Sequence, residues 1–166
     1  MTIPNSSILL ATTAALVTGT AVFAQTADER YGLEVAKKNM ATFKTADGLK
    51  VALVAAEPMI QNPTNIEVDP KGRIWAVECV NYRRNMKLRP EGDRVVILED
   101  TDGDGLVDKE KTFYQNVAMT NPLGICVLPQ AKGTKVIVSA APNVWLLTDS
   151  DGDDVAEDAK VIFKIG

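Results

Sequence analysis

Short apolar runs rich in Val, Ile and Leu recur along the chain, each bounded by polar or turn-forming residues. The runs at 94–99 and 143–148 have no helical period, and runs of this length are typical of buried strands. Residues 49–55 predict a leading strand after the Asp47-Gly48 turn. Further strands are predicted at 62–68, 72–78, 111–117, 121–127, 134–140 and 160–163.

The order of these runs repeats along the chain. Residues 62–68 match 121–127, residues 72–78 match 134–140, and residues 94–108 match 143–157. Four short strands recurring every ~40–60 residues are typical of propeller blades, whereas a sandwich would not require the same motif order. The sequence predicts an all-β fold of about two four-stranded blades plus the leading strand. Because a propeller closes with four to eight blades, we expect these to be the front of a longer, incomplete propeller.

The most distinctive polar stretch is a D-x-D-x-D-G loop at residues 100–108, which returns in altered form at 149–157. Carboxylates this close repel one another, and a hard cation that takes six to eight oxygen ligands removes the conflict. The loops differ from an EF-hand, because strands flank them and position 12 of the first is Lys111. We therefore predict structural Ca²⁺ sites whose ligands come from Asp100, Asp102, Asp104, Leu106 and Asp108, and from Asp149, Asp151, Asp153, Val155 and Glu157.

The second loop has Asp154 where the first has a turn glycine. A residue other than glycine adopts positive φ at some cost, so we expect weaker calcium binding there. The alternative for both loops is a solvated acidic turn without metal.

The amino-acid composition excludes several kinds of catalytic and metal site. The chain has no histidine and no C-x-x-C-H motif, which excludes a Ser-His-Asp triad, His-ligated zinc and covalently attached c-type haem. Twelve of its twenty-two acidic residues lie in 99–110 and 149–158. The other ten are outnumbered by the eighteen Lys and Arg residues, so the net charge of −4 arises from these two loops. No segment is basic enough to predict nucleic-acid binding. Cys79 and Cys126 are isolated, and either a disulfide or two free thiols is compatible with their spacing.

The N-terminus resembles a signal for export. Residues 8–24 carry no charge and end in Val22-Phe-Ala24, which suits cleavage before Gln25. We expect a signal peptide at 1–24 and a periplasmic or secreted protein that meets the membrane only through this segment; a membrane anchor is the rival interpretation. A leader at 25–43 is predicted to be partly helical, because Leu33, Ala36 and Met40 share one helical face. The blades then occupy 44–166.

Several motifs together resemble a known family. They are Ala46-Asp-Gly-Leu-Lys-Val51, Ala55-Ala-Glu-Pro58, Asn62-Pro-Thr-Asn65, Gly72-Arg-Ile-Trp75, Asn81-Tyr-Arg83, residues 91–105 and Ala141-Pro-Asn-Val-Trp145. Their order is similar to that in the PVC-type membrane-bound dehydrogenases, which are related to glucose/sorbosone dehydrogenase-like propellers. The resemblance covers about residues 43–165. It implies an exported propeller, completed by downstream blades, that oxidises a small sugar or alcohol with a quinone-type cofactor or a haem relay. The chain alone is expected to be inactive.

Candidate cofactor ligands lie in the long insertion between two strands of the first blade. Tyr82, Arg83 and Arg84 stand there, and the planar guanidinium suits carboxylates, so this loop could hold an anionic cofactor such as pyrroloquinoline quinone. The alternative is a solvated loop balanced by nearby acids. Glu78 ends a strand and would serve as a base if its pKa were raised. Trp75 and Trp145 are predicted to be core residues.

Two alternatives to a dehydrogenase remain open at this point. One is a non-catalytic, calcium-stabilised propeller that binds polysaccharide or protein. The other is a calcium-dependent adhesion fragment.

Overall fold

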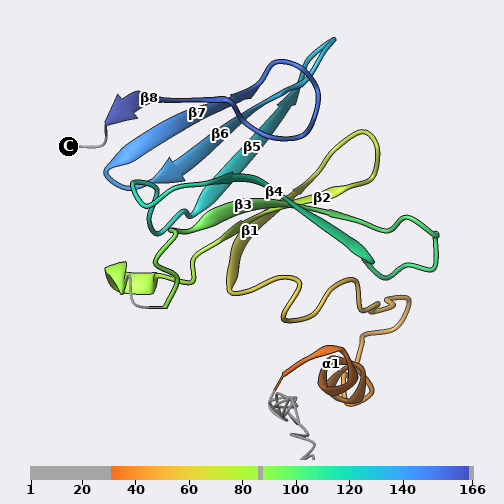
Figure 1. Cartoon of the computed structure of the whole chain (residues 1–166). Coiled ribbons are helices and arrows are strands. Elements are labelled where there is room, and N and C mark those ends of the chain that lie inside the picture. The colour runs from red at the N-terminus through yellow and green to blue at the C-terminus, as the bar shows by residue number, and fades with distance from the viewer. Residues whose placement is uncertain (1–30, 86–87, 165–166) are drawn as a thin grey trace, which may run out of the picture.

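The computed structural model describes residues 31–85 and 88–164. One short helix, α1 (Leu33–Met40), precedes two groups of four strands (Figure 1). The first group is β1 (Pro63–Val68), β2 (Ile74–Glu78), β3 (Arg94–Glu99) and β4 (Lys109–Gln115), with a short 3₁₀ helix η1 (Tyr82–Arg84) between β2 and β3. The second group is β5 (Gly124–Pro129), β6 (Thr134–Ala140), β7 (Asn143–Asp149) and β8 (Asp158–Lys164).

Each group forms one antiparallel sheet in which neighbours along the chain are neighbours in space. The orders are β1-β2-β3-β4 and β5-β6-β7-β8. These up-and-down sheets are the kind of unit from which propellers are built, and the two lie one beside the other in Figure 1. The predicted all-β fold of two blade-like, four-stranded units with a short N-terminal helix is confirmed.

The two sheets also repeat each other in detail. In the first, β3 pairs with β4 through Val95–Tyr114 and Val96–Thr112, so that one residue bulges out between them. In the second, β7 pairs with β8 through Val144–Phe163 and Trp145–Val161, with a bulge at the matching place. A shared register and a shared bulge confirm that the sequence repeat is a structural repeat, because bulges mark specific positions in a sheet.

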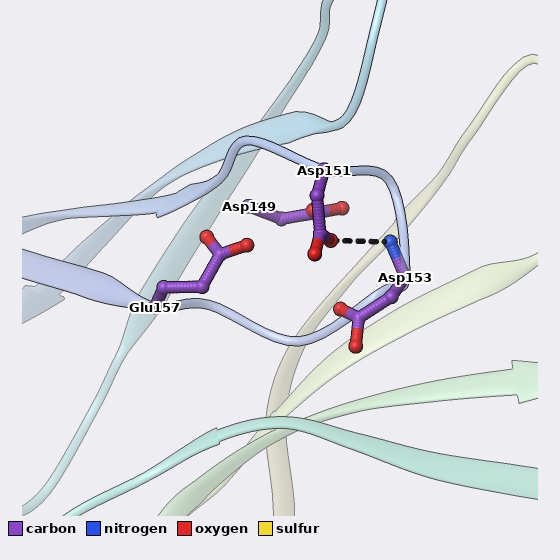
Figure 2. Close-up of side chains that lie close together, drawn as sticks. All are labelled: Asp149, Asp151, Asp153 and Glu157. Carbon is purple, nitrogen blue, oxygen red and sulfur yellow. Dashed lines mark hydrogen bonds between the residues drawn. The ribbon is translucent and has the colours of Figure 1, made fainter.

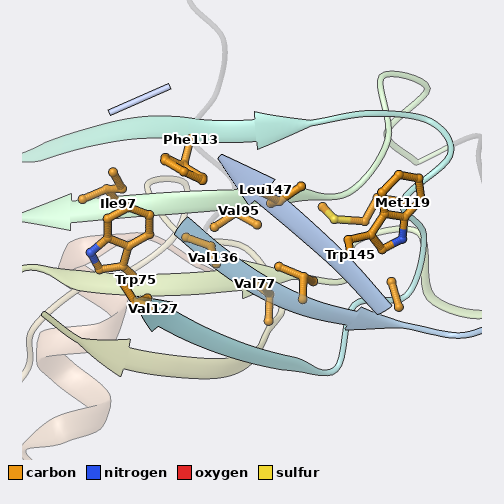
Figure 3. Close-up of a cluster of buried hydrophobic side chains, with 12 residues drawn as sticks. Trp75, Val77, Val95, Ile97, Phe113, Met119, Val127, Val136, Trp145 and Leu147 are labelled. Atoms are coloured by element: carbon orange, nitrogen blue, oxygen red, sulfur yellow. The ribbon is translucent and has the colours of Figure 1, made fainter. Parts of the chain in front are cut away.

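The main core lies between the sheets (Figure 3). Trp75, Val77 and Phe113 of the first sheet are fully buried, and Val136 and Leu147 of the second are also inaccessible to solvent. The rings of Trp75 and Phe113 meet edge to face, with centroids 4.8 Å apart. Both tryptophans lie in this core, as the sequence predicts.

The predicted leading strand at 49–55 is not formed. Within the described part of the chain this segment has no ladder partner, and its one main-chain bond to a sheet connection runs from Val107 N–H to the Val54 carbonyl (2.8 Å). Of this segment, Ala55 packs with Met59 and Ile60 on the outer face of the first sheet at Val96 and Leu98. The larger apolar side chains of Leu49, Val51 and Val54 are exposed. A short apolar run therefore does not by itself determine that a strand forms.

The leader contains the predicted helix, but α1 buries no residue. Among the described residues, none of the helices combines the length and the apolar character that crossing a membrane requires. The predicted signal peptide at 1–24 lies outside the described residues.

Candidate metal centres and their surroundings

The first acidic loop leaves β3 and returns into β4, and its carboxylates organise its own backbone. Asp100 accepts the N–H groups of Gly103 (2.7 Å) and Gly105 (2.9 Å), which lower the pKa of this carboxyl. Asp108 closes the loop by accepting the N–H (3.2 Å) and the hydroxyl (2.7 Å) of Thr101. Oxygens of Asp100, Asp102 and Asp108 lie within 4.8 Å of one another. Three of the four predicted carboxylate ligands thus converge, whereas Asp104 lies outside this group.

The second loop joins β7 to β8 and brings together all four of its predicted carboxylates (Figure 2). Asp149, Asp151, Asp153 and Glu157 each offer an oxygen within 4.8 Å of the others. Asp149 is buried at the end of β7, while the other three are exposed. The N–H groups of Glu157 itself and of Ser150 lower the pKa of Glu157, which favours its anionic form. A buried carboxylate facing three exposed ones forms a cup of oxygen donors open to solvent.

Both donor sets suit a hard cation. Ca²⁺ takes carboxylate and main-chain carbonyl oxygens, often with water completing the shell. The predicted non-acidic ligands, Leu106 and Val155, can contribute only main-chain carbonyls, because their side chains carry no donor atom. Cysteine and histidine are absent from both loops, so the chemistry of the residues fits calcium better than zinc.

Asp154 adopts the positive φ that its place in the loop predicts (64°). Its carboxylate accepts a hydrogen bond from Arg73 Nη1 (2.7 Å), which reaches across from the first sheet. This ion pair offsets part of the backbone cost, and the second loop also gathers one more carboxylate than the first. The positive φ of Asp154 should lower the calcium affinity of this loop, as the sequence predicts, whereas the additional carboxylate should raise it.

Arg73 is the centre of a buried polar group that sequence reasoning missed. Its Nε donates to Asp69 Oδ2 (2.8 Å), and Trp75 Nε1 donates to the same oxygen (3.0 Å). Burial alone would raise the pKa of Asp69, but the bonds from Trp75 and Arg73 lower it. Asp69 and Arg73 line a cleft of about 240 Å³ between the sheets, together with Asp149 and Asp154 of the second loop. The Asp-x-x-x-Arg spacing in the sequence is compatible with the Asp69–Arg73 pair, but it does not reveal the distant partner Asp154.

The candidate cofactor residues lie in η1, within the long insertion between β2 and β3. Tyr82 is 58% exposed, and the Arg83 guanidinium lies over its ring, 5.4 Å from the centroid. Arg83 has a positive φ (55°). Arg84 belongs to the same turn. This arrangement displays one aromatic ring and one cation side by side without enclosing them.

Two other arginines of this region bind Glu78 instead. Glu78 is completely buried and accepts hydrogen bonds from Arg89 Nη1 (2.6 Å), Arg94 Nε (2.6 Å) and the Gln61 N–H (2.7 Å). Burial would raise the pKa of Glu78, but Arg94, the Gln61 N–H and Arg89 together lower it. The condition under which Glu78 would serve as a base, a raised pKa, is therefore not met.

A family model described as "Domain of unknown function (DUF7133)" matches residues 35–165. The chain belongs to this family. No curated protein matches it. A solved structure, the holo form of the pyranose dehydrogenase PQQ domain from Coprinopsis cinerea, is 18% identical with a TM-score of 0.45, covering 63% of this chain and 22% of that chain. The chain thus spans less than a quarter of the length of that structure.

The two cysteines of this DUF7133 chain are both free thiols. Cys79 is buried, Cys126 is exposed, and no disulfide joins them. Burial and the nearby Asp93 carboxylate raise the pKa of Cys79, so its thiol stays protonated. Of the two alternatives that the sequence leaves open, the pair of free thiols is the one found.

Proposed function

We propose that this DUF7133 chain binds calcium at both acidic loops and contributes the first blades of an exported propeller dehydrogenase. The observation that carries the calcium proposal is the convergence of Asp149, Asp151, Asp153 and Glu157 within 4.8 Å. Four like charges at that separation repel, and a divalent cation replaces the repulsion with attraction. Because the loop also contacts the first sheet, a bound ion would fix the junction of the two blades.

Calorimetric titration of the purified chain with CaCl₂ tests this proposal. We expect two binding events, one of which disappears in Asp151→Asn and the other in Asp102→Ala. Asp158→Asn is the matched control, because Asp158 is an exposed carboxylate just outside the second loop and pairs only with Lys160 among the ion pairs of the described chain. A parent chain that releases no heat, or an Asp151→Asn variant that titrates like the control, contradicts calcium binding at the loop concerned.

For the whole protein we propose the oxidation of a small sugar or alcohol. In support, the motif order resembles that of propeller dehydrogenases, and η1 presents Tyr82 and Arg83 together at the surface. Tyr82, Arg83 and Arg84 would contact an anionic quinone such as pyrroloquinoline quinone, whose role when bound is to accept the electrons of the oxidation. The guanidinium groups would pair with its carboxylates.

The test is a dye-reduction assay of the protein expressed from its full reading frame, supplied with calcium, pyrroloquinoline quinone and a panel of sugars and alcohols. Arg83→Leu should weaken binding of the quinone, whereas Lys132→Leu, which removes an exposed cation from the β5–β6 turn, should not. Absence of activity with every substrate, together with unchanged quinone binding in Arg83→Leu, contradicts the proposal.

One observation favours a second candidate, a non-catalytic propeller that binds polysaccharide or protein. Glu78, the strand-end carboxylate proposed as a base, is occupied by two arginines and has a lowered pKa. Binding of immobilised polysaccharides by a protein that is inactive in the dye assay would support this candidate. For either function we propose a periplasmic or secreted location, which cell fractionation and N-terminal sequencing of the mature protein would test.

A further inference from the structure

The eighth residue of each acidic loop makes the same contact with the part of the chain that precedes its sheet. In the first loop, Val107 N–H donates to the Val54 carbonyl (2.8 Å). In the second, Ala156 N–H donates to the carbonyl of Phe113 in β4 (2.9 Å). Each loop is therefore hydrogen-bonded to the preceding unit as well as joining two strands of its own sheet.

Two cations of the first sheet strengthen this contact with the second loop. Arg73 pairs with the side chain of Asp154, the sixth residue of the loop (2.7 Å). Lys111 Nζ donates to the main-chain carbonyl of Asp153, the fifth residue. The first sheet thus presents a cation for the sixth residue, a cation for the fifth and a carbonyl acceptor for the eighth.

The second sheet carries the same three groups on its other side. The shared register makes Ile162, the bulged residue of β8, the equivalent of Phe113. Lys160 pairs with Leu146 as Lys111 pairs with Ile97. Lys135 precedes Val136 as Arg73 precedes Ile74, and Val136 and Ile74 occupy matching places opposite Leu147 and Leu98.

The exposure of these equivalents differs. Phe113 is completely buried by the second sheet, whereas Ile162 is 50% exposed. Lys160 is exposed, and among the ion pairs of the residues that the structure describes it has a surface pair with Asp158 (2.9 Å), which is weak enough to exchange. Apolar side chains of the same face, including Ile137 and Leu146, are half-buried, where their counterparts Trp75 and Ile97 are buried.

We propose that this outer face of the second sheet binds a third four-stranded unit whose third strand ends in an acidic loop of the same kind. The eighth residue of that loop donates its N–H to the Ile162 carbonyl. Lys160 donates to the main-chain carbonyl of the loop's fifth residue, and Lys135 pairs with a carboxylate on its sixth residue. This proposal deepens the proposed function, because it rests on the chain being the first blades of a larger propeller. Neither calcium binding nor dehydrogenase activity is required for it.

Thiol labelling tests the proposal. Ile162→Cys is placed in a Cys126→Ser background and compared between the 166-residue chain and the protein expressed from its full reading frame. Val117→Cys is the control, because Val117 is 58% exposed and lies outside this face. We expect the maleimide to label both cysteines readily in the 166-residue chain. In the longer protein, Ile162→Cys should react at least about tenfold more slowly, because labelling then requires local opening, while Val117→Cys should be unchanged.

A second variant shows whether the acidic loop is the occupant. Lys135→Glu in the longer protein should raise the labelling rate of Ile162→Cys towards that of the 166-residue chain, and Lys132→Glu, in the neighbouring turn, should leave it slow. Equal labelling of Ile162→Cys in both proteins overturns the proposal. Protection already present in the 166-residue chain, with elution as a dimer, also overturns it by making a second copy the occupant. All rates are measured with calcium and with EDTA, so failure of the calcium proposal is seen separately.

Discussion

Glu78→Gln should be among the most destabilising single substitutions in this fold. The side chain is completely buried and accepts bonds from Arg89 and Arg94, whose own side chains are only 12% and 13% exposed. Glutamine keeps the shape but removes the carboxylate that pairs with Arg89, and it leaves the largely buried Arg94 with the more exposed Glu110 alone among the ion pairs of the described residues. Removing one partner of a buried ion pair costs about 3–5 kcal/mol, a large share of the ~5–15 kcal/mol that keeps a domain folded. For a fold of this size the midpoint of thermal unfolding should fall by about 10 °C.

The chain supplies its own control for this prediction. Glu110 pairs with the same Arg94 (3.0 Å), but its side chain is 39% exposed. Glu110→Gln should therefore cost less than about 1 kcal/mol, as exposed pairs do. Urea unfolding at pH 7 in EDTA, followed by fluorescence of the buried tryptophans, measures both variants. If Glu78→Gln costs no more than Glu110→Gln, the two arginines do not depend on the buried carboxylate.

The lowered pKa of Glu78 also gives this contribution a pH dependence with a definite sign. The ordinary value is 4.5 and the folded-state value lies below it, so the unfolded chain takes up the proton first as the pH falls. The stabilisation is complete above pH 4.5 and is lost as the pH falls through the folded-state pKa. Glu78→Gln should flatten the decline in stability below pH 4.5, and a slope equal to that of the parent would refute the assigned pKa direction.

Three further outcomes are expected. Calcium at 100 times its Kd should raise the free energy of unfolding by about 2.7 kcal/mol per occupied site, reversed by EDTA in the same thermal melt. Phe113→Ala, which removes a fully buried ring, should cost about 3–5 kcal/mol in urea unfolding, whereas Phe163→Ala, at 63% exposure, should change the 166-residue chain by less than about 0.5 kcal/mol. Cys126 should react with a thiol reagent under native conditions, and Cys79 should react only on unfolding.

What the sequence predicted well depends on local patterns. Strands from residue 63 onward follow from short apolar runs, and the loops at 100–108 and 149–157 follow from carboxylates whose targets are main-chain N–H groups a few residues away. The same locality explains the repeat, since a matching order of strands and turns produced matching registers. Patterns of this kind determine an element without knowledge of its neighbours.

What the sequence did not predict depends on partners that are distant along the chain. Residues 49–55 have a strand's composition but pair with no strand of the described chain. Ala55 packs on the outer face of the first sheet, while Leu49, Val51 and Val54 stay exposed. From the sequence, Glu78 is a carboxylate at the end of a strand, and only the fold shows that Arg89 and Arg94 donate hydrogen bonds to it. Sequence spacing carries no information on such contacts, so the direction of the Glu78 pKa shift could be assigned only from the fold.

The position of the second acidic loop explains why a metal there would matter beyond its own turn. Asp154 and the Ala156 N–H bind the first sheet from one side of the loop, while Asp149, Asp151, Asp153 and Glu157 face one another within it. Carboxylate repulsion tends to open the loop, and opening it would pull these inter-sheet contacts apart, together with that of Lys111 and the Asp153 carbonyl. An ion that holds the carboxylates together therefore also stabilises the junction of the sheets. Arg73→Met should weaken this coupling, leaving calcium able to bind while reducing the gain in inter-sheet stability that binding produces.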